Sequence, residues 1–115
     1  MYYELSKREK KIARQIIDKG ADIEFKLGLK KVKALIAEWE NGNLDNRESY
    51  HKLFQIVKEH DKRIAKRYDG LGGSRYLFTV AAILYDKQIT QEEIKDFSDD
   101  AKEWVMRWIS IWNEE

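Results

Sequence analysis

The two histidines of this chain are the first side chains to consider for acid–base or metal chemistry. His51 and His60 are nine residues apart, which places them on opposite faces of one helix, so they cannot share a metal ion without ligands from elsewhere. His60 falls on the apolar face of that helix, between Val57 and Ile64. We expect a histidine at the edge of the core with a backbone or side-chain hydrogen-bond partner, and a functional role as the alternative.

Metal and nucleophile chemistry find little support in the residue types. Glu48 and His51 have the Glu-x-x-His spacing of di-metal helical bundles, but that site needs two such motifs and two further inward glutamates. The chain has no cysteine, which excludes thiolate metal sites and cysteine catalysis. It also has no Gly-x-Ser-x-Gly motif. The sequence therefore predicts a non-enzyme without catalytic residues, metal or cofactor.

A glycine-rich turn precedes an apolar segment and offers the best candidate for a small ligand. Backbone N–H groups at a helix start can bind an anion. Nucleotide-binding motifs require a preceding strand, and neither a strand nor a P-loop lysine is present. A flexible turn is the simpler interpretation, and a weak phosphate or carboxylate site is the alternative. The residues of this candidate site are Gly70, Gly72, Gly73, Ser74 and Arg75.

Charge divides along the chain, although the net charge of its 115 residues is only +1. Residues 1–33 contain ten Lys and Arg against five Asp and Glu, whereas residues 90–115 contain three against eight. The basic segment could contact nucleic acid, or it could lie beside the acidic segment of the same chain or of a second chain. The candidate nucleic-acid contacts are Lys7, Arg8, Lys10, Lys11 and Arg14.

The elements that carry these residues are predicted to be helices throughout, because apolar residues recur at spacings of three and four. Residues 5–40 carry two apolar faces that differ by about 140° of helical rotation. Either the helix breaks near Gly20, or one long helix meets two sets of partners; we favour two helices or one kinked helix. The second of these faces holds Phe25, Leu29, Val32, Leu35, Ile36 and Trp39.

Helix caps define the remaining elements. Asp45 is predicted to cap a helix that ends near Tyr68, with an apolar face of Tyr50, Leu53, Val57, His60, Ile64 and Tyr68. The segment 75–86 is apolar on nearly every side, which predicts a central buried helix, with Ser74 as its cap. Thr90 and Glu93 form a capping box, and Ser98 caps the last helix. The sequence thus predicts an all-α fold, a compact bundle of five or six helices in one domain, residues 1–115.

Four tryptophans are present, and three follow a helical stripe in the last helix. A stripe in the core is the simpler interpretation, and an interface is the alternative because tryptophan is frequent in binding hot spots. The candidate interface residues are Trp104, Trp108, Ile111 and Trp112.

The function expected from these patterns is protein interaction or regulation by a small cytoplasmic protein that associates with itself as a dimer. The N-terminal segment lacks the apolar region of a signal peptide, and the longest apolar run is too short to span a bilayer. A second protein is another possible partner, and no membrane partner is expected. A nucleic-acid-associated accessory protein is the alternative function.

Overall fold

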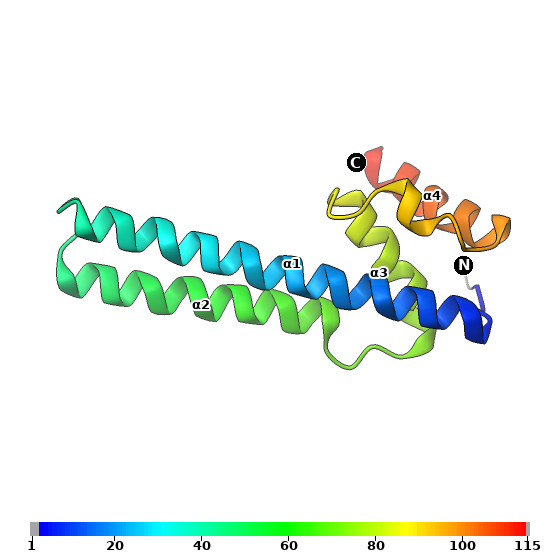
Figure 1. The fold of residues 1–115 in the computed structure, drawn as a ribbon, viewed down its shortest axis with the longest axis horizontal. Helices are drawn as coiled ribbons and strands as arrows, with labels where there is room; N and C mark the ends of the chain where they lie inside the picture. Colours follow the sequence, from blue (N-terminus) through cyan, green and yellow to red (C-terminus); the bar gives the residue numbers. More distant parts are fainter. Residues whose placement is uncertain (1–2, 115) are drawn as a thin grey trace. The chain divides into compact units, whose positions relative to one another are not determined.

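The computed structural model describes residues 3–114, with the backbone only at Gly73 and Ser74. Within these residues the fold is all-helical, as predicted, and no strand occurs. It has four α-helices and one short 3₁₀-helix, whereas the sequence predicted five or six helices (Figure 1). The elements are α1 (Lys7–Glu40), α2 (Asn46–Tyr68), α3 (Gly73–Tyr85), η1 (Gln91–Ile94) and α4 (Asp99–Asn113).

Helix α1 continues through Gly20 without a break, so the prediction of two separate helices is wrong, and the prediction of a kink stays a prediction. Gly20 lies in the helix interior and is buried. A glycine there costs only about 1 kcal/mol relative to alanine, and no other turn residue accompanies it to end the helix. The alternative prediction, one long helix with two sets of partners, is confirmed.

The described residues form two compact units that share α1. Residues 3–21 and 70–114 make the first, called here the α3–α4 unit, and residues 22–69 make the second, called here the hairpin. Each apolar face of α1 serves one unit: Ile16 and Ile17 are buried in the first, and Leu35 is buried in the second. The two apolar faces of α1 therefore belong to separate units, each with its own partners.

Packing of α3 against α4 forms the core of the α3–α4 unit. The ring of Phe78 lies edge-on to Trp108 and Trp112, with ring centres 5.2 and 5.4 Å apart. Helix α3 is less enclosed than predicted, because Tyr85 is 40% exposed. The buried apolar residues of this unit are Leu5, Ala13, Ile16, Ile17, Leu77, Val80, Ala81, Ile83, Ile89, Ile94, Phe97, Ala101, Trp104 and Val105.

Glu9 joins the starts of two helices within the α3–α4 unit. One carboxylate oxygen accepts hydrogen bonds from the N–H and hydroxyl of Ser6, both at 3.2 Å, which completes a capping box at α1. The other accepts from the N–H of Ser98 at 3.1 Å, and Ser98 caps α4 as predicted. Burial raises the pKa of Glu9, but the hydrogen bonds from Ser98 and Ser6 together lower it by more than burial raises it. The pKa of Glu9 therefore lies below its usual value.

Substituting Glu9→Gln is expected to cost about 1–2 kcal/mol of stability at neutral pH, because the charged acceptor of both helix starts is lost. The lowered pKa of Glu9 means that its contribution is complete above 4.5, the ordinary value, and is lost as pH falls through the folded-state value. Urea unfolding of wild type and variant at several pH values measures this. The stability difference should shrink on acidification; a constant difference would contradict the role given to the carboxylate.

Candidate interaction surface

A tight loop between α1 and α2 sends the chain back along itself (Figure 1). Gly42 has φ +79°, a left-handed conformation that favours glycine. Its N–H donates to the carbonyl of Trp39, and the N–H of Asn43 donates to that of Glu38, so the end of α1 is capped. Asp45 then accepts from the N–H of Glu48 at 2.7 Å, which confirms it as the cap of α2.

Two contacts fix the register of the hairpin. Near the loop, the indole N–H of Trp39 donates to Asn46 at 2.7 Å. Farther along, Gly28 lies against His60, whose Nε2–H donates to the carbonyl of Glu24 at 2.6 Å. The predicted place of His60, at the core edge with a backbone partner, is confirmed. Since His60 donates to a main-chain group inside the hairpin, this contact gives it a structural role.

Glu24 is a buried carboxylate that sequence reasoning missed. Its side chain is 1% exposed and lies 3.6 Å from the guanidinium of Arg63 and 3.9 Å from that of Arg67. The ring Nε2 of His60 lies 3.5 Å from the other carboxylate oxygen. Glu24 lies four residues before Gly28 and eleven before Leu35, so helical spacing places it on the same face as these two residues. This spacing is the feature of the sequence that could have indicated its burial. The two guanidinium groups stabilise a charge that would otherwise be costly to bury.

Alanine at position 28 is expected to destabilise the hairpin, although alanine favours helices more than glycine. A Cβ at Gly28 would lie 2.9 Å from Cδ2 of His60, whose ring is anchored by its hydrogen bond to Glu24. Overpacking costs about 1–3 kcal/mol, and the gain in helix propensity is about 1 kcal/mol. We expect a net loss of about 1 kcal/mol, measured by urea unfolding.

The matched control for Gly28→Ala is the same substitution in a His60→Ala background. With the ring removed, the alanine should stabilise the protein by its helix propensity, about 1 kcal/mol. If Gly28→Ala stabilised the wild-type chain equally, the close approach of Gly28 and His60 would not constrain the hairpin.

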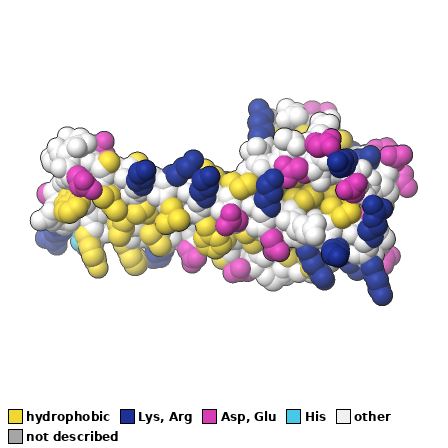
Figure 2. Space-filling view, viewed as in Figure 1, with side chains coloured by type: hydrophobic (Ala, Val, Ile, Leu, Met, Phe, Trp, Pro, Cys, Tyr) yellow, Lys and Arg dark blue, Asp and Glu magenta, His cyan; other side chains and the backbone are white. Residues whose placement is uncertain are grey.

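One side of the hairpin carries a continuous stripe of exposed, large apolar side chains, called here the apolar face. Helix spacings of three and four place the stripe along both helices. Exposed fractions range from 39% for Ile36 to 72% for Tyr50. Hydrophobic side chains gather in a band along the hairpin in Figure 2. The members are Phe25, Leu29, Ile36, Trp39, Tyr50, Phe54 and Val57.

Two shallow grooves follow each other along this face. One, of about 230 Å³, lies between Phe25, Leu29 and Val32 of α1 and Val57 and Ile64 of α2. The other, of about 300 Å³, lies nearer the loop between Ile36 and Trp39 of α1 and Tyr50 and Leu53 of α2. Their walls are predominantly apolar, so they suit apolar side chains of a partner better than a polar metabolite.

The tryptophan stripe of α4 is packed mainly against α3. Trp104 is 9% exposed, and Trp108 and Trp112 are half-buried beside Phe78. Ile111 is the most exposed of the four candidate interface residues, at 38%. The core interpretation therefore fits Trp104, while Trp108 and Trp112 keep part of their surface exposed. Contact of this stripe with another chain stays a prediction.

The glycine turn differs from the predicted cap arrangement. Helix α3 begins at Gly73 with Gly72 as its N-cap residue, so the prediction that Ser74 caps this helix is wrong, and its side chain lies outside the described part of the chain. Gly70 has φ +65°, which explains a glycine at that turn. Arg75 is exposed. Anion binding at this turn stays a prediction.

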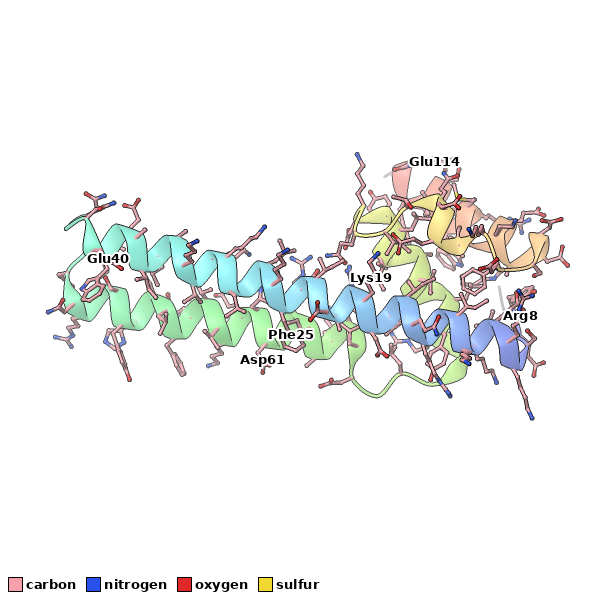
Figure 3. All side chains as sticks on the ribbon, in the orientation of Figure 1. Arg8, Lys19, Phe25, Glu40, Asp61 and Glu114 are labelled. Atoms are coloured by element: carbon pink, nitrogen blue, oxygen red, sulfur yellow. The ribbon has the colours of Figure 1, made fainter. Side chains whose placement is uncertain are left out.

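The candidate nucleic-acid contacts all lie in the first turns of α1. Lys7, Arg8, Lys11 and Arg14 are exposed and Lys10 is half-buried. The guanidinium of Arg14 donates to the hydroxyl of Tyr76 at 3.1 Å and lies over its ring. Farther along α1, Lys19 pairs with Glu93 of the acidic segment at 2.7 Å; Figure 3 labels Arg8 and Lys19. Nucleic-acid contact stays a prediction.

Comparisons with protein families, curated proteins and solved structures found no match for this chain. Across residues 3–114, no group of three acidic or histidine side chains is arranged to hold a metal ion. No helix in the described part has the length and apolarity needed to cross a bilayer. Functional interpretation therefore rests on the surface itself, and the apolar face is its most distinctive feature.

Proposed function

We propose that this chain is a small, non-catalytic protein-interaction or regulatory module of the cytoplasm that associates with itself. Its contact surface in this proposal is the apolar face of the hairpin. The observation that carries the proposal is the exposure of that face: Leu29, Tyr50 and Phe54 are each more than 60% exposed on one side of two adjacent helices. Contiguous exposed apolar surface of this kind marks interaction sites in soluble proteins.

The energetics of covering this face favour association. Seven large side chains, each roughly half exposed, would contribute on the order of 1 kcal/mol apiece when water is removed from them. Two such faces in contact therefore contribute on the order of 14 kcal/mol. This is comparable to the upper part of the range of about 4–15 kcal/mol that association costs in lost rigid-body freedom. Ordering of side chains adds to that cost. The net affinity is therefore expected to be modest, with a dimeric fraction that rises with protein concentration.

Size-exclusion chromatography with light scattering, run over a concentration series, tests the proposal. A mass that rises towards twice 13.8 kDa supports self-association. A single-chain mass at every concentration would contradict it. Absorbance at 260 nm that salt removes would instead support the alternative, contact of the basic segment of α1 with nucleic acid.

A further inference from the structure

We propose that two hairpins pair through their apolar faces into a four-helix bundle, with the twofold axis parallel to the helices. In this arrangement α1 of one copy packs beside α2 of the other, and the two loops lie at the same end. The inference deepens the proposed self-association and rests on it. Its evidence is the distribution of charge along the two edges of the apolar face.

The apolar face is bordered on each side by a line of residues, called here an edge, one on α1 and one on α2. The residues of an edge are seven apart in the sequence, which places them in one line along the helix. The edge of α1 has Lys26, Lys33 and Glu40, and the edge of α2 has Arg47, Phe54 and Asp61. All six side chains are exposed, and among residues 3–114 none of the five charged ones makes an ion pair. These charges are therefore available to a partner.

The register of the hairpin sets these residues at matching heights. Since Gly28 lies against His60, Lys26 is level with Asp61 to within about one residue rise of 1.5 Å. Near the loop, the bond from Trp39 to Asn46 brings Glu40 level with Arg47 to within about 3 Å. Figure 3 labels Glu40 beside the loop and Asp61 toward the other end of α2.

Lys33 and Phe54 lie midway, seven residues from both ends of their lines. Within one chain Asp61 lines the groove beside Phe25, whereas helical spacing places Lys26 on the flank of α1 that points away from α2. No ion pair joins Lys26 to Asp61, or Glu40 to Arg47, within the described residues of the hairpin.

Rotation about a twofold axis parallel to the helices leaves the position of every residue along the helix direction unchanged. It brings the α1 edge of one copy against the α2 edge of the other. Lys26 then faces Asp61 of the second copy, and Glu40 faces Arg47 of the second copy. Lys33 faces Phe54, which its aliphatic stem can cover. Opposite charges meet at both ends of each edge. In the middle, Lys33 comes near one like charge, Lys58, whose ammonium lies 5.9 Å from the centre of the Phe54 ring.

A twofold axis perpendicular to the helices is the main alternative for two copies. It also joins opposite charges, Lys26 with Glu40 and Arg47 with Asp61, but it sets Lys33 against Lys33 of the second copy. Exposed pairs contribute only about 0.2–1 kcal/mol each, so they select the orientation while apolar burial drives association. The two Lys33 side chains would meet at the same height, whereas in the parallel arrangement Lys33 and Lys58 are offset by four residues, about 6 Å along the helix axis. The weaker like-charge repulsion therefore favours the parallel axis.

The size of the face fits this occupant. Two adjacent helices over residues 22–40 present a surface about 28 Å long and about 20 Å wide. A stable dimer buries about 800 Å² from each partner, and a corrugated surface of these dimensions is comparable. The hairpin, residues 22–69, has eleven Lys and Arg against nine Asp and Glu, so its net charge of +2 does not oppose pairing.

Cysteine cross-linking tests the arrangement, because the chain has no cysteine of its own. Lys26→Cys and Asp61→Cys are made as separate full-length chains, mixed and oxidised. We expect a disulfide-linked pair of the two variants, and little cross-linking of either variant alone. The mismatched control mixes Lys26→Cys with Arg47→Cys, which lie about 20 Å apart along the bundle, far beyond the reach of a disulfide.

Light scattering of each mixture before oxidation shows whether the chain self-associates, independently of whether the twofold axis is parallel to the helices. A dimeric mixture in which Lys26→Cys cross-links to Glu40→Cys, and not to Asp61→Cys, would overturn the parallel axis and leave self-association in place. A mixture that stays monomeric would overturn both. Cross-linking of Glu40→Cys to Arg47→Cys would support the arrangement at its second contact.

Discussion

A chain that carries both Leu29→Glu and Tyr50→Glu is expected to stay folded and to lose its self-association. Both side chains are largely exposed, at 70% and 72%, so glutamate costs the single chain little. Neither position faces a cation in the proposed arrangement, so at the covered interface each carboxylate would be buried without a partner, which costs several kcal/mol. We expect the dissociation constant to rise about 1,000-fold, which corresponds to about 4 kcal/mol. Sedimentation equilibrium measures it.

The matched control places the same two charges elsewhere on the hairpin. Leu27 and Gln55 are exposed, and helical spacing puts both on the side opposite the apolar face. Leu27→Glu with Gln55→Glu should leave the dissociation constant within a few-fold of wild type. Equal weakening by both pairs would show that net charge, and not the apolar face, governs association.

Trp104→Ala is expected to unfold the α3–α4 unit or bring it close to unfolding. Trp104 is buried, and its ring centre lies 5.8 Å from that of Trp108. Removing a buried aromatic side chain costs about 3–5 kcal/mol, a large share of the about 5–15 kcal/mol that stabilises a typical domain. Urea unfolding followed by circular dichroism gives the loss.

Ile111→Ala on the same helix is the control for Trp104→Ala. Ile111 is 38% exposed, so its truncation should cost about 1 kcal/mol or less. Losses of equal size at the two positions would contradict the assignment of the tryptophan stripe to the interior of the α3–α4 unit.

Local signals allowed the sequence to predict several helix starts. Asp45 and Ser98 cap α2 and α4 because each side-chain oxygen needs only a backbone N–H a few residues ahead. The continuity of α1 could not be predicted in this way. Gly20 locally favours a break, but each of the two units packs against one apolar face of α1, and the helix continues from one unit into the other. Segments far apart in sequence decide that outcome, so periodicity alone could not.

The residues of the apolar face were visible in the sequence, but their exposure was not. Phe25 and Trp39 were placed on one apolar stripe, and Tyr50 and Val57 on another. An apolar stripe normally predicts burial. Only the structure reveals that α1 and α2 cover each other on one side and leave this stripe open. The tryptophans of α4 led to the interface prediction because of their residue type, whereas in the structure Phe78 of α3 packs edge-on against two of them, Trp108 and Trp112.

Hydrogen–deuterium exchange of the wild-type chain at low and high concentration both detects self-association and locates the contact between the two chains. Amides of residues 25–39 and 50–61 are expected to exchange more slowly at high concentration, while those of α4 do not change. Slower exchange confined to residues 104–112 would contradict this expectation and return the interface to the tryptophan stripe. Exchange that is independent of concentration throughout the chain would contradict self-association itself.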